Sequence, residues 1–586
     1  MYAILLKFIK KHFFIYLSGI LLLISVGFLQ LLIPQILRQA TDEFSKMTAT
    51  VSSISNYALT IVILAIFMII LRYGWRMLIW GTSRKLEKIV REEFYKKLQT
   101  LDSNYYNYHK TGDLMALATN DINAVRLAMG EGLLLITDSL FMTVLGIYYL
   151  ININFSLFLA VFIPLPIIAL VVLIFGRLIH HLFKRAQEGF AQLTSIVQES
   201  ISGIRVIKAY GQEEGELENF KETAGDLVNR NLDLVRIWGV FTPLVQFLSS
   251  ISLFITLFYG GRLVIVGAIT IGDFVAFHAY LGLLTWPMMA LGWVANILQR
   301  GKASMQRINE VFDQVPGIKD LPDVNKAISS IYGQIEFKDV TYQYPGKEKP
   351  TLEKLSFIIK PGETMGIIGR LGSGKSTMLN LIPRLYDPGE GEIFIDGHNI
   401  KSIPLRVLRK YVGYVPQETF LFSDTIKENI AFSFPHSSLN SIEEVLKKAQ
   451  LYDDVMSLPE KLETEIGERG VTLSGGQKQR ATIARALHIN PKILILDDSF
   501  SSLDTQTEEK LIKAIIEYNK NIGCTTLIVS HRVSCLKHAD NIIVIDKGKI
   551  IQSGTHDILV KRPGLYAHLF ELQQLEKEDS SRYEES

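Results

Sequence analysis

The stretch Gly-Arg-Leu-Gly-Ser-Gly-Lys-Ser at residues 369–376 fits the pattern G-x-x-x-x-G-K-[ST]. It follows the apolar run Met365–Ile368, which predicts a short buried strand, and it precedes the helix-like run Thr377–Leu385. In such a loop, glycines let backbone N–H groups turn inward around phosphate oxygens, and the helix adds its positive N-terminus. The pattern therefore predicts a nucleotide phosphate site, in which Lys375 reaches the β- and γ-phosphates and Ser376 ligates Mg²⁺. The candidate contacts are Gly369, Arg370, Leu371, Gly372, Ser373, Gly374, Lys375, Ser376 and Thr377.

A second buried strand is expected at Ile493–Asp497, an apolar run that ends in a carboxylate. An acidic residue at the carboxyl end of a strand beside a phosphate loop is placed to organise Mg²⁺. Around these two strands, from Gly333 onward, short β-like runs alternate with helical patterns. That alternation predicts a doubly covered parallel sheet with helical crossovers, the α/β fold of a P-loop NTPase.

The rest of the chain has a different character. The 586 residues exceed the size of one compact domain, and 48% of them are hydrophobic against 20% charged. The long apolar runs all lie before about residue 300. The formal net charge of +2 gives no indication of a nucleic-acid partner. Only two cysteines are present, Cys524 and Cys535, so a disulfide framework is not expected and a reducing compartment fits.

Six apolar segments are long enough to cross a bilayer, which takes about 20 residues as a helix. They are Phe13–Ile33, Tyr57–Trp80, Leu133–Ile151, Phe155–Phe175, Trp238–Tyr259 and Phe274–Leu298. The alternative for the first segment is a secretory signal peptide, but its apolar run is longer than such a core and no small-residue cleavage site follows. The sequence therefore predicts an α-helical, multi-pass membrane domain that contacts the lipid bilayer.

Basic residues decide the expected orientation in the cell membrane. Lys7, Lys10 and Lys11 precede the first segment, and basic clusters also follow the second and fourth segments. The connection at 152–154 carries no charge at all. By the positive-inside rule, both chain termini are expected in the cytoplasm. The two inner connections, roughly 81–132 and 176–237, look helical and amphipathic, which predicts that membrane helices continue into the cytoplasm and end in short transverse helices.

Three ionisable residues fall within the predicted spans, namely Arg72, Arg76 and Asp138. Such residues commonly mark a substrate pathway or a charged partner. The alternative is that both arginines extend their side chains toward the inner membrane surface. Trp75 and Trp80 are expected to act as interfacial anchors rather than ligand contacts.

The expected domain organisation follows from these patterns. Residues 1–310 form the transmembrane domain with two long cytoplasmic loops, and the Pro- and Gly-containing stretch 311–332 is a linker. Residues 333–575 form the α/β domain. The charged tail 576–586 has little to bury and is expected to be disordered.

The stretch Leu-Ser-Gly-Gly-Gln at 473–477 is the signature motif of the ATP-binding cassette (ABC) family, which this chain resembles along nearly its whole length. It precedes the helical run Lys478–Leu487, so its N-terminal amides are placed to hold a γ-phosphate. Further motifs fall in the family's order. The resemblance implies that Tyr344 stacks on adenine, that Gln417 links the nucleotide and its Mg²⁺ to the membrane domain, and that His531 is the switch histidine. Residues Ser501–Asp504 resemble the family's D-loop. The nucleotide contacts implied by the signature and the D-loop are Ser474, Gly475, Gly476, Gln477 and Asp504.

In this family two cassettes face each other head to tail, and each ATP lies between one chain's phosphate loop and the other's signature. With one cassette, the chain resembles a half-transporter that needs a homologous second half, with ATP and Mg²⁺ as cofactors. Residues 108–115 with 119–121 resemble the first coupling helix to the cassettes, and 210–214 the second. Glu468–Gly470 resembles the exporter-specific contact to the membrane domain.

One residue departs from the family's pattern. Hydrolytic cassettes carry Glu after the Mg²⁺-organising aspartate, as the base that positions the attacking water, whereas this chain carries Asp498. The substitution is typical of one member of heterodimeric exporters, with closest resemblance to multidrug half-transporters of Gram-positive bacteria. We therefore expect a heterodimer, with a homodimer as the alternative, and an impaired catalytic site formed by Asp498, His531 and Gln417.

The resemblance favours ATP-driven efflux of drugs or other small amphiphilic compounds. A lipid or lipid-linked flippase shares the same fold and motifs and stays open as an alternative. Peptide export is a further alternative, weakened because no N-terminal cysteine-peptidase domain precedes the first span. The six spans exclude a soluble ABC ATPase that acts in DNA repair or translation, and importers usually carry permease and ATPase on separate chains.

Overall fold

A computed structural model describes residues 1–467 and 473–584, apart from the side chains of 164–166, 168, 169, 172, 173, 249, 285, 288, 289, 291 and 576–584. The chain divides into two compact units. The helical unit comprises Met1–Leu98 and Gly112–Asp313, and the α/β unit comprises Gln99–Thr111 and Gln314–Ser586.

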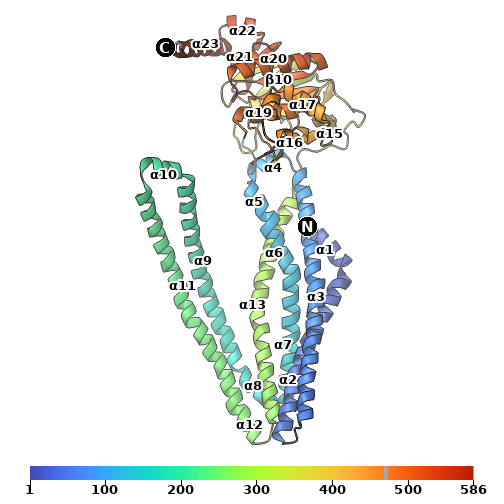
Figure 1. The fold of residues 1–586 in the computed structure, drawn as a ribbon, viewed down its shortest axis with the longest axis vertical. Coiled ribbons are helices and arrows are strands. Elements are labelled where there is room, and N and C mark those ends of the chain that lie inside the picture. The colour runs from blue at the N-terminus through green and yellow to red at the C-terminus, as the bar shows by residue number, and fades with distance from the viewer. Residues whose placement is uncertain (468–472, 585–586) are drawn as a thin grey trace. The chain divides into compact units, whose positions relative to one another are not determined.

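The helical unit is built from long apolar helices joined by short turns (Figure 1). Four stretches of described helix are long and apolar enough to span a membrane: Phe13–Ser45, Val51–Thr100, Thr111–Ile153 and Glu213–Ile265, with Ile271–Leu284 as a shorter apolar helix. The predicted fourth and sixth spans lie on helices whose side chains are described only in part. The helices are α1 (Tyr2–Lys11), α2 (Phe13–Ser45), α3 (Val51–Thr100), α5 (Thr111–Ala116), α6 (Ile122–Leu127), α7 (Leu133–Ile153), α8 (Phe155–Phe162), α9 (Pro164–Ser202), α10 (Ile204–Tyr210), α11 (Glu213–Ile255), α12 (Gly261–Ile265) and α13 (Ile271–Asp313), with π-helical turns η1 (Leu117–Asp121), η2 (Ala128–Gly132) and η3 (Thr256–Gly260).

The helices α9 and α11 are longer than a bilayer requires. They contain 39 and 43 residues, so α11 extends roughly 65 Å at about 1.5 Å per residue, against a hydrocarbon core of about 30 Å. Figure 1 shows them side by side, closed at one end by the short helix α10. Gly211 ends α10 with a positive φ of 60°, a conformation that favours glycine. The length of this pair and the short helix α10 at its end fit the prediction that spans continue beyond the membrane into a short transverse helix, which stays a prediction.

The apolar core of the helical unit lies between α2, α7 and α13. Leu31, Met142, Phe277 and Tyr280 are buried there together. The hydroxyl of Tyr280 donates a hydrogen bond to the backbone carbonyl of Leu31 at 2.9 Å. Because a buried hydroxyl without a partner costs free energy, this bond fixes α13 against α2 as well as satisfying the tyrosine.

The α/β unit contains a six-stranded sheet in the order β12-β11-β3-β10-β9-β6. Its strands are β3 (Thr364–Gly369), β6 (Val412–Val415), β9 (Ile493–Asp497), β10 (Thr525–Val529), β11 (Asn541–Asp546) and β12 (Lys549–Gly554). All pairs are parallel except β11 with β12. Every residue of β3, β9 and β10 is buried, as expected when helices cover both faces of a parallel sheet. The predicted strands and the parallel sheet are therefore confirmed.

A second, antiparallel sheet has the order β2-β1-β4-β5, formed by β1 (Ile335–Tyr342), β2 (Leu352–Ile359), β4 (Glu390–Ile395) and β5 (His398–Asn399). The small pair β7 (Asp424–Thr425) and β8 (Glu465–Ile466) completes the strands of the described residues. The helices of this unit are α4 (Ser103–Tyr108), α14 (Lys375–Leu381), α15 (Leu405–Lys410), α16 (Ile426–Ile430), α17 (Leu439–Lys448), α18 (Tyr452–Met456), α19 (Gly475–His488), α20 (Thr505–Ile522), α21 (Val533–Leu536), α22 (His556–Lys561) and α23 (Leu565–Glu584).

The structure differs from the sequence expectation at two boundaries. The last helix of the helical unit, α13, ends at Asp313 rather than at residue 310. The helix α23 continues to Glu584, across most of the stretch expected to be disordered. The tail contains four Glu, one Lys and one Arg, which have good helix propensity, so it can extend a helix that begins in packed residues.

Candidate functional site

Four strands of the parallel sheet deliver the predicted nucleotide residues to one edge. The phosphate loop follows β3, Asp498 follows β9, His531 lies just beyond β10, and Gln417 lies just beyond β6. Because neighbouring parallel strands end at the same edge, residues that are far apart in the sequence meet there. They line a cavity of about 240 Å³ whose walls include Tyr344, 371–377, Gln417, Asp497, Asp498 and His531.

The glycines of the phosphate loop are required by its geometry. Gly372 and Gly374 have φ values of 74° and 102°, in the region where a side chain is strained. A Cβ atom on Gly374 would also lie 2.7 Å from a methyl carbon of Leu352 and 2.9 Å from the carbonyl oxygen of Thr351. Only glycine therefore allows the loop to turn here with its amides directed inward.

Lys375 is held in place at the start of α14. Its ammonium group donates to the carbonyl oxygens of Gly369 and Arg370, both at 2.9 Å. Burial lowers the pKa of this lysine, whereas the negative charges of Asp497 and Asp498 oppose that shift. The ammonium group of Lys375 is therefore a positively charged hydrogen-bond donor held beside the phosphate loop, an arrangement that suits binding of a phosphate oxygen.

Asp497 and Ser376 form the candidate Mg²⁺ position. Asp497 is only 2% exposed, and its carboxylate accepts a hydrogen bond from the Ser376 hydroxyl. Burial raises the pKa of Asp497, with the neighbouring charge of Asp498 adding to the rise and Lys375 and the hydrogen bond opposing it. A hydroxyl and a carboxylate side by side are the hard oxygen ligands that Mg²⁺ prefers. The buried hydroxyl of Ser373 has no hydrogen-bond partner among the described residues, which fits a loop whose polar groups await a phosphate.

Asp498 has a constrained backbone. Its φ is 46°, in the left-handed region that Asp tolerates better than most residues. Its N–H donates to the carbonyl of Val529 at 3.0 Å, and its own carbonyl accepts from the hydroxyl of Ser501 at 3.2 Å. Both backbone polar groups of Asp498 are thus engaged, so the start of its side chain is fixed relative to β10.

The aromatic residue assigned to adenine lies at the rim of the same cavity. Tyr344 packs edge-on against Tyr342 and Tyr386, and its hydroxyl lies 3.2 Å from that of Thr377. The ammonium of Lys347 lies 5.4 Å from the ring centroid of Tyr344. Lys347 was not singled out by sequence reasoning, although a lysine three residues after the aromatic residue was the available signal.

The signature residues do not line this cavity. Ser474 caps α19, and its hydroxyl accepts from the N–H of Gln477 at 3.2 Å while the Gln477 side chain accepts from the N–H of Ser474 at 3.0 Å. This capping box satisfies two of the helix's first N–H groups and leaves others directed outward. The N-terminus of α19 therefore lies outside the cavity formed by the chain's own phosphate loop.

Gln479 ties the signature helix to the D-loop and was missed by sequence reasoning. The side chain is buried, donates to the Ser501 hydroxyl at 3.1 Å and accepts from the N–H of Ser502 at 3.1 Å. Next to it, a Cβ atom on Gly476 would lie 3.0 Å from the carbonyl oxygen of Ser502. The start of the signature helix is therefore held against Ser501 and Ser502.

We predict that Gln479→Ala destabilises the α/β unit by about 1–3 kcal/mol, because it removes the two hydrogen bonds that the buried Gln479 side chain forms with Ser501 and Ser502. Thermal unfolding of the full-length chain, followed by intrinsic fluorescence, measures the loss. Lys510→Ala on the exposed side of α20 is the matched control and should change little. An unfolding temperature for Gln479→Ala equal to that of the control would contradict this account.

Two other predicted residues have clear local roles. Asp504 is the N-cap of α20 and accepts from the N–H groups of Gln506 and Thr507 at 3.1 and 2.9 Å. These bonds lower the pKa of Asp504, and the side chain does not line the cavity. His531 does line the cavity. Its backbone carbonyl accepts a hydrogen bond from the side chain of Gln573 on α23 at 2.7 Å, so α23 helps to hold the backbone of this histidine in place.

Residues 99–111, which include the start of the first coupling stretch, belong to the α/β unit. The side chain of Asn107 on α4 donates to the Tyr386 hydroxyl at 3.0 Å, and the Tyr108 hydroxyl donates to the carbonyl of Pro345. Residues 111–121 instead begin the next long helix. The motif at 210–214 spans the end of α10 and the start of α11, and Glu468–Gly470 lies outside the described residues.

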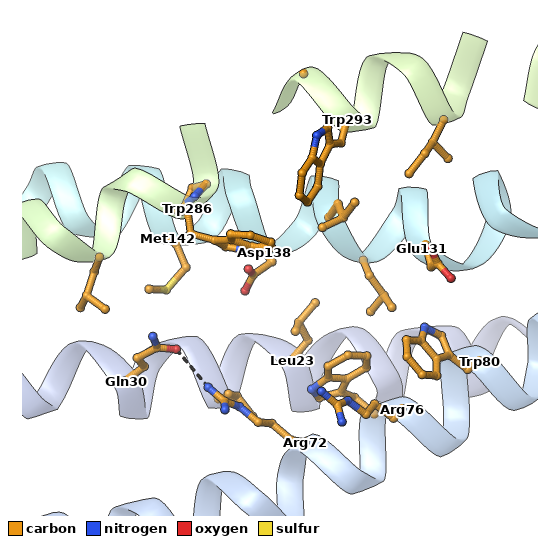
Figure 2. A pocket seen from close by; sticks show the side chains of 18 of the residues that line it. Leu23, Gln30, Arg72, Arg76, Trp80, Glu131, Asp138, Met142, Trp286 and Trp293 are labelled. Carbon is orange, nitrogen blue, oxygen red and sulfur yellow. Dashed lines mark hydrogen bonds between the residues drawn. The ribbon is translucent and has the colours of Figure 1, made fainter. Parts of the chain in front are cut away.

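The helical unit contains a cavity of about 860 Å³ between α2, α3, α7 and α13 (Figure 2). All three ionisable residues predicted inside the spans line it, together with Glu131. Trp75 and Trp80, expected as interfacial anchors, line it as well. The guanidinium of Arg76 lies over the rings of both, at 5.5 and 5.8 Å from their centroids.

Comparisons with known proteins cover both units. The ABC transporter transmembrane region matches residues 15–288, and the ABC transporter domain matches residues 352–501. The chain is 39% identical over 98% of its length to the probable multidrug resistance ABC transporter ATP-binding/permease protein YheI of Bacillus subtilis, of which 98% is covered. It is 35% identical to an ATP-dependent lipid A-core flippase of Syntrophus aciditrophicus, covering 83% of this chain and 80% of that one. A solved bacterial Atm1-family ABC exporter with ATP bound superposes with a TM-score of 0.77 at 25% identity, over 96% of this chain and 98% of that one.

Proposed function

The chain belongs to the ABC transporter family, as an exporter with an N-terminal transmembrane region fused to one ABC cassette, and on that premise we propose that it exports drugs or other amphiphilic compounds as one half of a heterodimer. Its cassette makes it an ATP-hydrolysing translocase, and exporters of this family function as dimers in the membrane. In this proposal the substrate is an amphiphilic compound, the second subunit is a homologous half-transporter, and the chain's own nucleotide site is catalytically impaired.

The need for a second cassette is supported by the separation of the two halves of the site. The cavity around Lys375 is lined by the phosphate loop, Gln417 and the carboxylates after β9, but not by residues 474–477. The capped N-terminus of α19 offers amides to a phosphate held elsewhere. Each ATP, with its Mg²⁺, would then lie between one chain's loop and the other chain's signature. When bound, Mg²⁺ neutralises charge on the phosphate oxygens, and Ser376, Asp497 and Gln417 would hold it here.

The single observation that carries the substrate proposal is the cavity between α2, α3, α7 and α13. Its volume of about 860 Å³ lies in the range of drug-sized binding sites, about 300–1,000 Å³. Apolar, aromatic and charged side chains line it together, which suits a molecule that has both apolar and polar parts. Relatives of this chain are named as multidrug exporters.

A lipid flippase is the second candidate, because one relative is named as a lipid A-core flippase. The two are separated by transport in proteoliposomes that contain the purified complex. An exporter of amphiphiles should accumulate an amphiphilic dye only with ATP and Mg²⁺, whereas a flippase should move a fluorescent phospholipid between leaflets. Lipid movement without dye accumulation would overturn the export proposal. Peptide export would be indicated instead if only peptides stimulate ATP hydrolysis.

We place the protein in the cell membrane with both termini in the cytoplasm. The support is the distribution of basic residues, since clusters such as Lys7, Lys10 and Lys11 flank the inner ends of the predicted spans. The long pair α9 and α11 would then extend into the cytoplasm, on the side where ATP is available.

We predict that the chain is active only with a homologous half-transporter that carries Glu at the position of Asp498. Co-expression with a tagged candidate, encoded by a neighbouring gene, should give a complex of 1:1 stoichiometry. The chain purified alone should hydrolyse ATP slowly, because two copies form two sites that both lack the glutamate. Native mass spectrometry and steady-state ATPase assays measure both quantities. Robust ATP hydrolysis and transport by a homodimer would contradict the heterodimer.

A further inference from the structure

The membrane cavity concentrates the tryptophans and charges of the helical unit. Four of the chain's five tryptophans line it, namely Trp75, Trp80, Trp286 and Trp293. Trp286 and Trp293 project from α13 and form an edge-to-face pair with ring centroids 5.5 Å apart (Figure 2). Large planar apolar surfaces of this kind suit the flat ring system of an aromatic ligand.

The charges in the cavity are separated by sign. The basic residues Arg72 and Arg76 come from α3, one helical turn apart on one face. The acidic residues Glu131 and Asp138 come from η2 and α7, two turns apart on one face. Figure 2 shows the two sets on opposite sides of the cavity. A basic wall therefore faces an acidic wall.

The two walls do not neutralise each other directly. Across the part of the chain that the structure describes, none of the four charged groups forms an ion pair within 4 Å. Arg72 is in contact with the Gln30 side chain at 3.5 Å, and Arg76 lies over tryptophan rings. The positive charge of Arg72 acts on Asp138 only at longer range. The cavity thus holds separated charges of both signs, in an environment where an uncompensated charge is costly.

We propose that this cavity selects aromatic amphiphiles that carry a positive and a negative group on the same molecule. The inference rests on the proposed export function and specifies its substrate class. A zwitterion can place its cationic group beside Asp138 and its anionic group beside Arg72, and so compensate both walls. A ligand with a single charge compensates one wall and is repelled by the other, which lowers its affinity.

Three dyes with a common xanthene skeleton test the charge requirement. Rhodamine B is zwitterionic, its ethyl ester is a cation, and fluorescein is an anion at neutral pH. Binding is measured by fluorescence anisotropy to the full-length complex in nanodiscs, with the signal of empty nanodiscs subtracted. We expect rhodamine B to bind about tenfold more tightly than either dye whose charge has only one sign, the effect of one charge-assisted contact.

Variants that remove one charge from each wall test the contribution of the basic wall and of the acidic wall separately. Arg72→Gln should abolish the preference for rhodamine B over its ester, because the carboxylate of the dye loses its contact. Asp138→Asn should weaken both rhodamines about tenfold and spare fluorescein. The matched controls are Asp233→Asn and Arg236→Gln, which remove an exposed ion pair on α11 and should leave all three affinities unchanged. Binding of a fluorescent ATP analogue to each variant shows that its α/β unit is folded, and the affinity for the dye that the variant should spare, rhodamine B's ester for Arg72→Gln and fluorescein for Asp138→Asn, reports on the helical unit.

The outcomes separate this inference from the export proposal. Tighter binding of the ester than of rhodamine B, or a preference that survives Arg72→Gln, would overturn the zwitterion requirement while leaving amphiphile export intact. Failure of all three dyes to bind or to be transported, with ATP binding intact, would overturn amphiphile export itself and the present inference with it.

Discussion

In a complex whose second half-transporter lacks its catalytic glutamate, the site that contains Asp498 should hydrolyse ATP about 100-fold more slowly than an intact site. A general base must lie within about 2.6–3.2 Å of the proton that it accepts. Asp is one methylene shorter than Glu, which withdraws the carboxylate by about 1–1.5 Å. A misplacement near 1 Å can cost on the order of 100-fold in rate. Single-turnover hydrolysis of radiolabelled ATP by the complex measures this rate.

A backbone shift could restore the position of the shorter carboxylate, but the structure opposes one. The N–H of Asp498 is bonded to Val529 on β10, and its carbonyl is bonded to Ser501. Moving the residue toward the cavity would break both bonds. The groups that hold nucleotide remain, because Lys375, Ser376 and Asp497 lie together as an intact site requires. We therefore expect a site that binds ATP and retains it for long periods.

The substitution Asp498→Glu should raise single-turnover hydrolysis at this site with little change in ATP affinity. Because φ at this position is 46° and Glu tolerates that region less well than Asp, the thermal stability of the variant is measured alongside. Asp498→Asn is the matched control and should not raise hydrolysis. Fast hydrolysis by the unmodified Asp498 site would show that the site is not impaired.

The second large effect is expected at the signature. We assume that the signature of this chain completes the nucleotide site of the second half-transporter. Ser474→Asp should then lower steady-state ATP hydrolysis of the complex by about 100-fold or more. Removing a hydrogen-bond donor that stabilises negative charge in the transition state has an effect of this size in other enzymes. The substitution places a carboxylate where a phosphate would bind. Asp is as good an N-cap as Ser, so α19 keeps its cap and the loss reports the site rather than the fold.

Lys375→Ala in the phosphate loop is the comparison for this variant. It removes an ammonium held by Gly369 and Arg370 and should weaken ATP binding at the chain's own site. Turnover of the complex should fall much less than with Ser474→Asp, since the competent site lies on the other phosphate loop. Photo-crosslinking with an azido-ATP, resolved by subunit, measures occupancy beside the ATPase rate. Equal losses of turnover from both variants would count against this assignment.

The sequence alone determined the parts of this protein that are continuous in the chain. The phosphate loop between β3 and α14, the aspartate at the end of β9 and the signature at the start of α19 each consist of neighbouring residues. Their chemistry depends on local backbone geometry, which glycine spacing and apolar runs specify directly. Four of the six predicted membrane spans lie on described helices that are long and apolar enough to cross a bilayer, because a bilayer imposes a minimum apolar length that the sequence shows directly. The charged tail was expected to be disordered, whereas the helix α23 continues through it to Glu584, because its composition also suits a helix that packed residues have already started.

The tertiary structure alone decided which distant residues meet. Gln479 joins the D-loop, and Asn107 reaches Tyr386 across 279 positions of sequence. For Arg72 the sequence left two interpretations open, a side chain that extends to the membrane surface or a substrate pathway, and for Asp138 it indicated a pathway or a charged partner. In the tertiary structure both residues line one cavity, Arg72 from α3 and Asp138 from α7, together with the tryptophans of α13. Side-chain periodicity shows which face of a helix is polar, but the partner of that face depends on the packing of several helices at once.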